Sequence, residues 1–94
     1  MPRLDEQRIA ELLAGLEGWQ RQGDAIVKEF RCGDFSGSVR FVARVAEVAD
    51  QLNHHRDVEI SWDRVRLSLT THSQGGLTER DFELARRIDE LAAE

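Results

Sequence analysis

Three histidines are the residues of this sequence best suited to acid–base chemistry near neutral pH, because an imidazole titrates there. Two are adjacent, His54 and His55, and the third, His72, follows two threonines. All three stand where a predicted helix or strand ends, and such positions often carry functional groups. The sequence therefore predicts that the three rings converge on one site.

Asp50 is the predicted partner of His54. The two residues are four apart near the end of a predicted helix, so they share a helical face. A carboxylate there can accept a proton from one ring nitrogen and fix the tautomer of the other. An exposed acid–histidine pair without function is the alternative, and the spacing alone favours it. His55 diverges from His54 by about 100° within a helix, so the two rings converge only if the chain turns there.

Metal chemistry is a weaker reading of the same histidines. Three imidazoles can hold zinc and leave one position for water. Adjacent histidines rarely present their nitrogens to one ion, however, and the sequence contains no His-Glu-x-x-His pattern. We therefore expect no metal site and no cofactor.

Nucleophilic catalysis has little support. Cys32 is the only cysteine, which excludes an internal disulfide, and within a predicted strand it reads as a small packed hydrophobe. Gly75 and Gly76 are too few for a phosphate loop and indicate a plain turn. Trp19 and Trp62 can stack on a flat ligand, but aromatic residues in strands more often belong to the core.

Composition limits the classes of function. A chain of 94 residues suits one domain, residues 1–94. Its net charge of −5 and scattered arginines argue against a nucleic-acid partner. It has no apolar run long enough to cross a membrane and no signal peptide at its start, so we expect a cytoplasmic protein without a membrane partner.

Hydrophobic periodicity predicts helices alternating with pairs of strands, which indicates an α+β fold with helices on one face of an antiparallel sheet. A resemblance to a capping box at residues 78–81, with Asp81 in place of the usual Glu or Gln, marks the start of the last helix. The predicted elements are a helix over 4–16, a strand over 25–31 with an early partner around Trp19, a helix over 34–53, strands over 58–62 and 65–71, and a final helix after 78.

The long helix over 34–53 carries two neighbouring apolar stripes. One begins at Phe35 and Val39, and the other at Phe41 and Val45. So wide an apolar face implies burial on more than one side. One side can cover the sheet, while the other needs a second helix or a second subunit; packing within the monomer is the alternative.

Along nearly its whole length the sequence resembles the pterin-4a-carbinolamine dehydratase family. The order His-His, then Thr-His, then Gly-Leu-Thr-x-x-Asp is specific to that family. The residues that carry the resemblance are Gly18-Trp19, Asp24-Ala25-Ile26, Phe30, Asp34-Phe35, Asn53-His54-His55, Thr70-Thr71-His72, Gly76-Leu77-Thr78-Glu79-Arg80-Asp81, Leu84-Ala85 and Ile88-Asp89.

The resemblance implies a four-stranded antiparallel sheet with three helices on one face, assembled as dimers or pairs of dimers. It also implies that the protein dehydrates 4a-hydroxytetrahydropterin to quinonoid dihydropterin, which recycles a pterin cofactor. Its pterin substrate would meet three catalytic histidines, which by position are His54, His55 and His72. Losing hydroxide requires a general acid and losing a proton requires a base, and imidazole can serve as either.

The same resemblance implies supporting residues. Asp50 falls where many members have Glu, and Asp81 matches an acid that begins the last helix, where helix capping is an equally good role. Trp19 matches a tryptophan near the pocket. The segment Thr71-His72-Ser73-Gln74 would lie along the pterin edge, so Thr71, Ser73 and Gln74 are implied substrate contacts.

Arg56 departs from the family pattern, which has proline after the two histidines. Proline would hold His55 extended, whereas Arg56 removes that restraint and adds a cation close to the substrate, unless it points into solvent. This departure keeps two rival readings open. One is a non-catalytic dimeric scaffold for a protein partner, and the other is a pterin-binding module without turnover.

Overall fold

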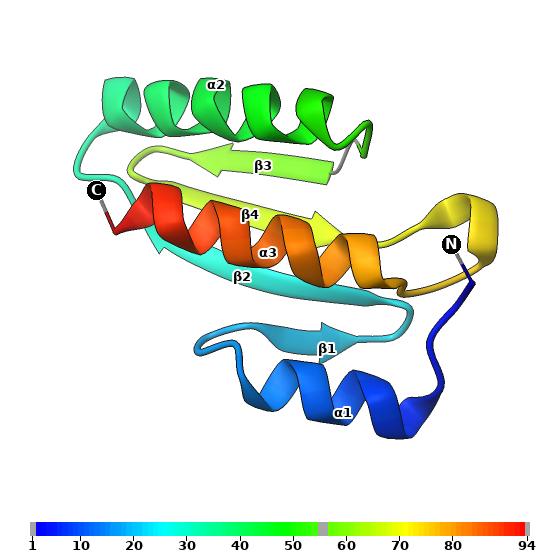
Figure 1. Ribbon diagram of the computed structural model, residues 1–94. Coiled ribbons are helices and arrows are strands. Elements are labelled where there is room, and N and C mark those ends of the chain that lie inside the picture. The colour runs from blue at the N-terminus through cyan, green and yellow to red at the C-terminus, as the bar shows by residue number, and fades with distance from the viewer. Residues whose placement is uncertain (1, 55–56, 94) are drawn as a thin grey trace.

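A computed structural model describes residues 2–54 and 57–93 and contains an antiparallel sheet with α-helices packed on one face (Figure 1). Within these ranges there are three α-helices and four strands, which confirms the predicted fold class. The elements are α1 (Glu6–Ala14), β1 (Gln20–Gln22), β2 (Ala25–Arg31), α2 (Phe35–Gln51), β3 (Asp57–Ser61), β4 (Arg64–Leu69), a 3₁₀ turn (His72–Gln74) and α3 (Glu79–Ala92).

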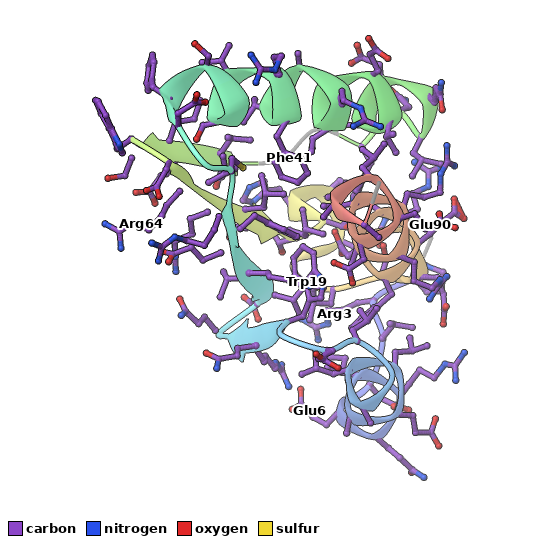
Figure 2. The ribbon with its side chains drawn as sticks, turned by 90° about the vertical axis from the view of Figure 1, so that its left-hand side faces the viewer. Arg3, Glu6, Trp19, Phe41, Arg64 and Glu90 are labelled. Carbon is purple, nitrogen blue, oxygen red and sulfur yellow. The ribbon has the colours of Figure 1, made fainter. Side chains whose placement is uncertain are left out.

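The strands lie in the order β1-β2-β4-β3, and every neighbouring pair is antiparallel. The long β2 and β4 therefore form the centre, while the short β1 and the exposed β3 form the edges. The inward residues of β4, Val65, Leu67 and Leu69, are fully buried. Seen from the side, α1, α2 and α3 all lie on the same face of the sheet (Figure 2).

The core fills the space between that face and the helices. Ile26 and Phe30 of β2 meet Phe82, Leu84 and Ile88 of α3, and all five are buried. The alternation in the strands and the 3.6-residue spacing in the helix place these apolar positions on facing surfaces. None of the helices in the described ranges has the length and apolarity needed to cross a bilayer.

The two apolar stripes of α2 differ in burial. Val45 and Val48, of the stripe that begins at Phe41, are buried in the core. Phe35 and Val39, at the start of the other stripe, are 53% and 46% exposed, whereas Ala49 near the end of the helix is buried. The stripe that begins at Phe41 therefore covers the sheet, and the start of the other stripe has no cover within the described part of this chain.

Helix ends depart slightly from the periodic pattern. The helix predicted over 34–53 begins after Asp34, whose carboxylate accepts a hydrogen bond from the Gly37 N–H at 2.6 Å, and ends at Gln51. The strand predicted over 65–71 ends at Leu69, and Thr71 then pairs with Gly76 across the 3₁₀ turn. The predicted capping box is confirmed, because the Thr78 N–H donates to Asp81 at 2.9 Å.

Candidate active site

The end of α2 determines where His54 lies. Asn53 has a φ of 51°, a left-handed conformation that Asn tolerates better than most residues. The His54 N–H then donates to the Ala49 carbonyl at 2.8 Å, and the Asn53 N–H to the Asp50 carbonyl at 3.1 Å. These two bonds form a Schellman motif, which ends the helix and reverses the chain. Because of this reversal, the His54 ring turns inward.

The His54 ring meets Asp81 in the interior. Its Nε2 lies 2.6 Å from Asp81 Oδ1, and the two side chains are 4% and 0% exposed. Asp81 is the third residue of α3, where a carboxylate also benefits from the positive end of the helix dipole. A buried carboxylate is costly unless its oxygens are hydrogen-bonded. The pair therefore holds the end of α2 against the start of α3.

Two threonines add hydrogen bonds to Asp81. The Thr71 hydroxyl donates to Asp81 Oδ2 at 2.8 Å, lies 2.9 Å from the Thr78 hydroxyl and lies 3.3 Å from His54 Nε2. The Thr78 N–H reaches the same Oδ2. With donors already on Oδ2, Oδ1 is the acceptor that faces the ring.

This arrangement fixes the tautomer of His54. An ionised carboxylate can only accept hydrogen bonds, so the ring nitrogen facing it, Nε2, carries the proton. In the neutral ring the lone pair then lies on Nδ1, which is the nitrogen able to take up a proton. The buried network thus engages Nε2 with Asp81 and leaves the lone pair on Nδ1.

The predicted pairing of Asp50 with His54 is wrong. The ring contacts Asp81 instead, because α2 stops at Gln51 and the turn at Asn53 carries His54 off the helical face that Asp50 occupies. Asp50 itself lies on the exposed surface near the end of α2.

His72 lies just beyond this network, in an exposed 3₁₀ turn together with Ser73 and Gln74. The preceding Thr71 is buried and holds Asp81, so the buried network anchors the residue next to His72. His72 lines a pocket of about 210 Å³ together with Asp24, Ala25, Thr70, Gly75 and Gly76. His54 is not in that lining, so Thr71 is the structural link between the two histidines.

Trp19 lies with the core rather than with the histidines. Figure 2 shows Trp19 among the side chains between the sheet and the helices. Its indole N–H donates to both carboxylate oxygens of Asp89 at 3.1 Å, and its ring packs edge-on against Phe30. Asp89 is eight residues beyond Asp81, about 12 Å along α3. By contrast Trp62, in the turn between β3 and β4, is 72% exposed, so the expectation that it belongs to the core is wrong.

The other residues considered from the sequence are His55, Arg56 and Cys32. His55 and Arg56 lie outside the described residues. Burial raises the pKa of the Cys32 thiol, which disfavours the reactive thiolate. Among the described side chains, no three His, Cys, Asp or Glu residues are grouped closely enough to hold a metal ion.

Sequence comparison decides the family. The family model described as pterin 4 alpha carbinolamine dehydratase matches residues 2–91. The chain belongs to this family. Among dehydratase relatives, a Thermomicrobium roseum protein provisionally given that name is 50% identical over 99% of this chain and 100% of its own. A Chloroflexus aurantiacus relative, named in the same way, is 50% identical over 97% of this chain and 98% of its own.

Two solved structures share the fold of this chain. A crystal structure of a transcriptional coactivator/pterin dehydratase from Brucella melitensis superposes with a TM-score of 0.91 at 38% identity, covering 96% of this chain and 98% of that one. A pterin dehydratase-like RuBisCO assembly factor of the alpha-carboxysome has a TM-score of 0.65 at 21% identity, covering 81% and 88%, and shares the fold.

Proposed function

We propose that this protein dehydrates 4a-hydroxytetrahydropterin to the quinonoid dihydropterin. The observation that best supports this function is the buried His54–Asp81 pair, tied through Thr71 to the segment that carries His72. The family of the chain supplies the substrate class. The His54 and His72 segments, 18 residues apart, thus share one rigid anchor.

The proposed reaction requires two proton transfers. The C4a–O bond breaks as a general acid protonates the departing hydroxyl group, the N5 proton passes to a base, and a C4a=N5 double bond forms as water leaves. His54 is proposed to act through Nδ1, and His72 through its exposed ring. His55 joins them on the strength of the resemblance. Each such transfer typically accelerates a reaction by about 10²–10⁴-fold.

The proposed roles of the supporting residues rest on two kinds of support, contacts in the structure and the family resemblance. Asp81 is proposed as the residue that positions His54. Contacts from Thr71, Ser73 and Gln74 to the pterin, through backbone groups near His72, remain part of the proposal. The roles of Asp50, Arg56 and Trp19 rest on the resemblance alone, and the position of Trp19 in the core does not favour direct contact with a pterin.

Rapid mixing tests this proposal. Carbinolamine generated in situ is mixed with the protein, and its dehydration is followed by ultraviolet absorbance. We expect a rate that rises with protein concentration and saturates with substrate. The Arg86→Ala variant, altered at an exposed position of α3, should keep the full rate. Equal rates with and without the protein would eliminate the proposal.

A non-catalytic protein-binding role is the second candidate. It is favoured by the exposed apolar side chains along α2, β3 and the turn that follows β3, namely Phe35, Val39, Val58, Ile60 and Trp62. Apolar groups gathered on a surface often mark an interface. We propose that a second copy of this chain covers them, which would make the protein a homo-oligomer. A cytoplasmic location is a separate part of the proposal. Binding of a protein partner together with no dehydration above the spontaneous rate would favour the scaffold role.

A further inference from the structure

A second pocket lies at the opposite end of the sheet from His54 and His72. It has a volume of about 390 Å³ and is formed where β2 ends, α2 begins and α3 ends. In Figure 1 these segments meet at the left, whereas the end of α2 and the 3₁₀ turn lie at the right. The pocket therefore shares no lining residue with the candidate active site.

The inner wall of this pocket is apolar and aromatic. Phe30 and Phe41 have ring centroids 5.0 Å apart, with planes inclined at 46°, and Leu91 of α3 completes the wall. Phe41 points from α2 toward the layer between the sheet and α3 (Figure 2). Phe30 is buried and Phe41 is half-buried, so the face of Phe41 is partly open to a ligand. Such walls favour a flat apolar body.

The charged residues of the lining are all arginines. Arg31, Arg40 and Arg44 line the pocket, and among the residues that the structure describes no carboxylate lines it, although the chain as a whole carries a net charge of −5. Arg40 and Arg44 are four apart on α2, so they share a face. Within the described residues Arg40 makes no ion pair, and Arg31 is held only loosely, 3.6 Å from Asp63. Arg40 and the loosely held Arg31 thus offer guanidinium groups to an anion.

We propose that this pocket binds a small organic carboxylate with a flat, apolar body. The guanidinium fork matches a carboxylate with two parallel hydrogen bonds, and the aromatic wall receives the body. The volume lies in the usual range for small-molecule sites. Neither the carboxylate nor the apolar body alone should bind tightly, because solvent-exposed charge pairs contribute little binding energy by themselves.

Titration of the ¹⁵N-labelled full chain with benzoate tests the proposal. We expect saturable shifts of the amide resonances around Arg40 and Phe41. Acetate carries the charge without the body, and benzyl alcohol carries the ring without the charge, so each should bind at least roughly tenfold more weakly, a difference of about 1.4 kcal/mol. Inorganic phosphate should bind no more tightly than acetate.

A charge-neutral variant gives the matched comparison. Arg40→Gln, altered at an exposed position, should weaken benzoate binding by roughly tenfold or more, whereas Arg86→Gln on α3 should leave it unchanged. Arg31→Gln provides a second test if the spectrum of the first variant shows that its fold has changed. The proposal is overturned if benzoate and acetate bind equally, if phosphate binds more tightly, or if both arginine variants bind like the original chain.

Discussion

Replacing Asp81 should reveal two separable roles for its carboxylate. It is fully buried and accepts hydrogen bonds from His54 Nε2 at 2.6 Å, Thr71 Oγ1 at 2.8 Å and the Thr78 N–H at 2.9 Å. Asp81→Ala removes the acceptor from all three donors. Breaking a buried charged pair in this way costs about 3–5 kcal/mol. For a domain of this size, the melting temperature should fall by at least about 12 °C.

Asp81→Asn should behave differently. Its oxygen can still accept from Thr71 and Thr78, while its NH₂ group donates to His54 Nε2, provided that the ring moves its proton to Nδ1. The folded state then loses only the difference between charged and neutral hydrogen bonds, about 1–1.5 kcal/mol. The reversed tautomer, however, removes the Nδ1 lone pair. Dehydration should therefore fall far more than stability does.

Three measurements check these two variants. Thermal unfolding gives the stabilities, rapid mixing gives the rates, and ¹⁵N shifts of the His54 ring report its tautomer. Glu83→Gln, an exposed charge change in the same helix, should stay within about 0.5 kcal/mol. If Asp81→Ala were as stable as Glu83→Gln, the anchoring role would be refuted. If the original chain carried the His54 proton on Nδ1, the assigned tautomer would be refuted, and if Asp81→Asn kept Nε2 protonated, the predicted reversal would be refuted.

Three further substitutions test the end of α2, the start of α2 and the exposed apolar stripe of that helix. Asn53→Ala should lower the free energy of unfolding by about 1 kcal/mol because of its left-handed backbone, whereas Asn53→Gly should change it by less than about 0.5 kcal/mol; equal losses in urea unfolding would contradict the proposed role of the turn. Gly37→Ala would place a Cβ 2.2 Å from the Cys32 carbonyl oxygen and should lower the free energy of unfolding by at least about 1–3 kcal/mol. Gly15→Ala, whose Cβ would lie 3.6 Å from its nearest neighbour, should be tolerated, and similar melting temperatures for the two variants would argue against the close approach at Gly37. Val39→Glu places a charge on the exposed stripe of α2 and should yield a lighter species in sedimentation velocity than the original chain; unchanged sedimentation would remove this stripe from the proposed subunit interface.

Most of the fold could be predicted because its signals are local. Alternation along β2 and β4, the apolar spacing in α3 and the Thr78–Asp81 capping box each appear within a few residues of sequence. The predicted strand over 25–31 matches β2 exactly in its bounds. The family resemblance added the number of strands, which is confirmed by the sheet order.

The partner of His54 could not be predicted from local spacing. Counting four residues back selects Asp50, but that rule holds only while the helix continues. One left-handed residue, Asn53, ends the helix and directs the ring toward Asp81, 27 residues later. The capping box marked Asp81 correctly, yet a capping carboxylate has a second oxygen, and nothing local to residues 78–81 says what that oxygen meets.

The position of Trp19 could not be predicted from local spacing either. A tryptophan beside a short edge strand can face a ligand or the core with equal periodicity. Its contacts with Asp89 and Phe30 come from α3 and β2, which are distant in sequence. The interactions that determine the position of Trp19 are thus tertiary, and they cannot be predicted from the local pattern of a single sequence.

The most direct test of the proposed function is the dehydration rate of the His72→Ala variant beside that of the original chain. His72 is exposed, so its removal should leave the fold and the buried network intact. We expect the rate to fall by about 10²–10⁴-fold while the melting temperature is unchanged. A folded variant that dehydrates the carbinolamine within twofold of the original rate would contradict a catalytic role for His72.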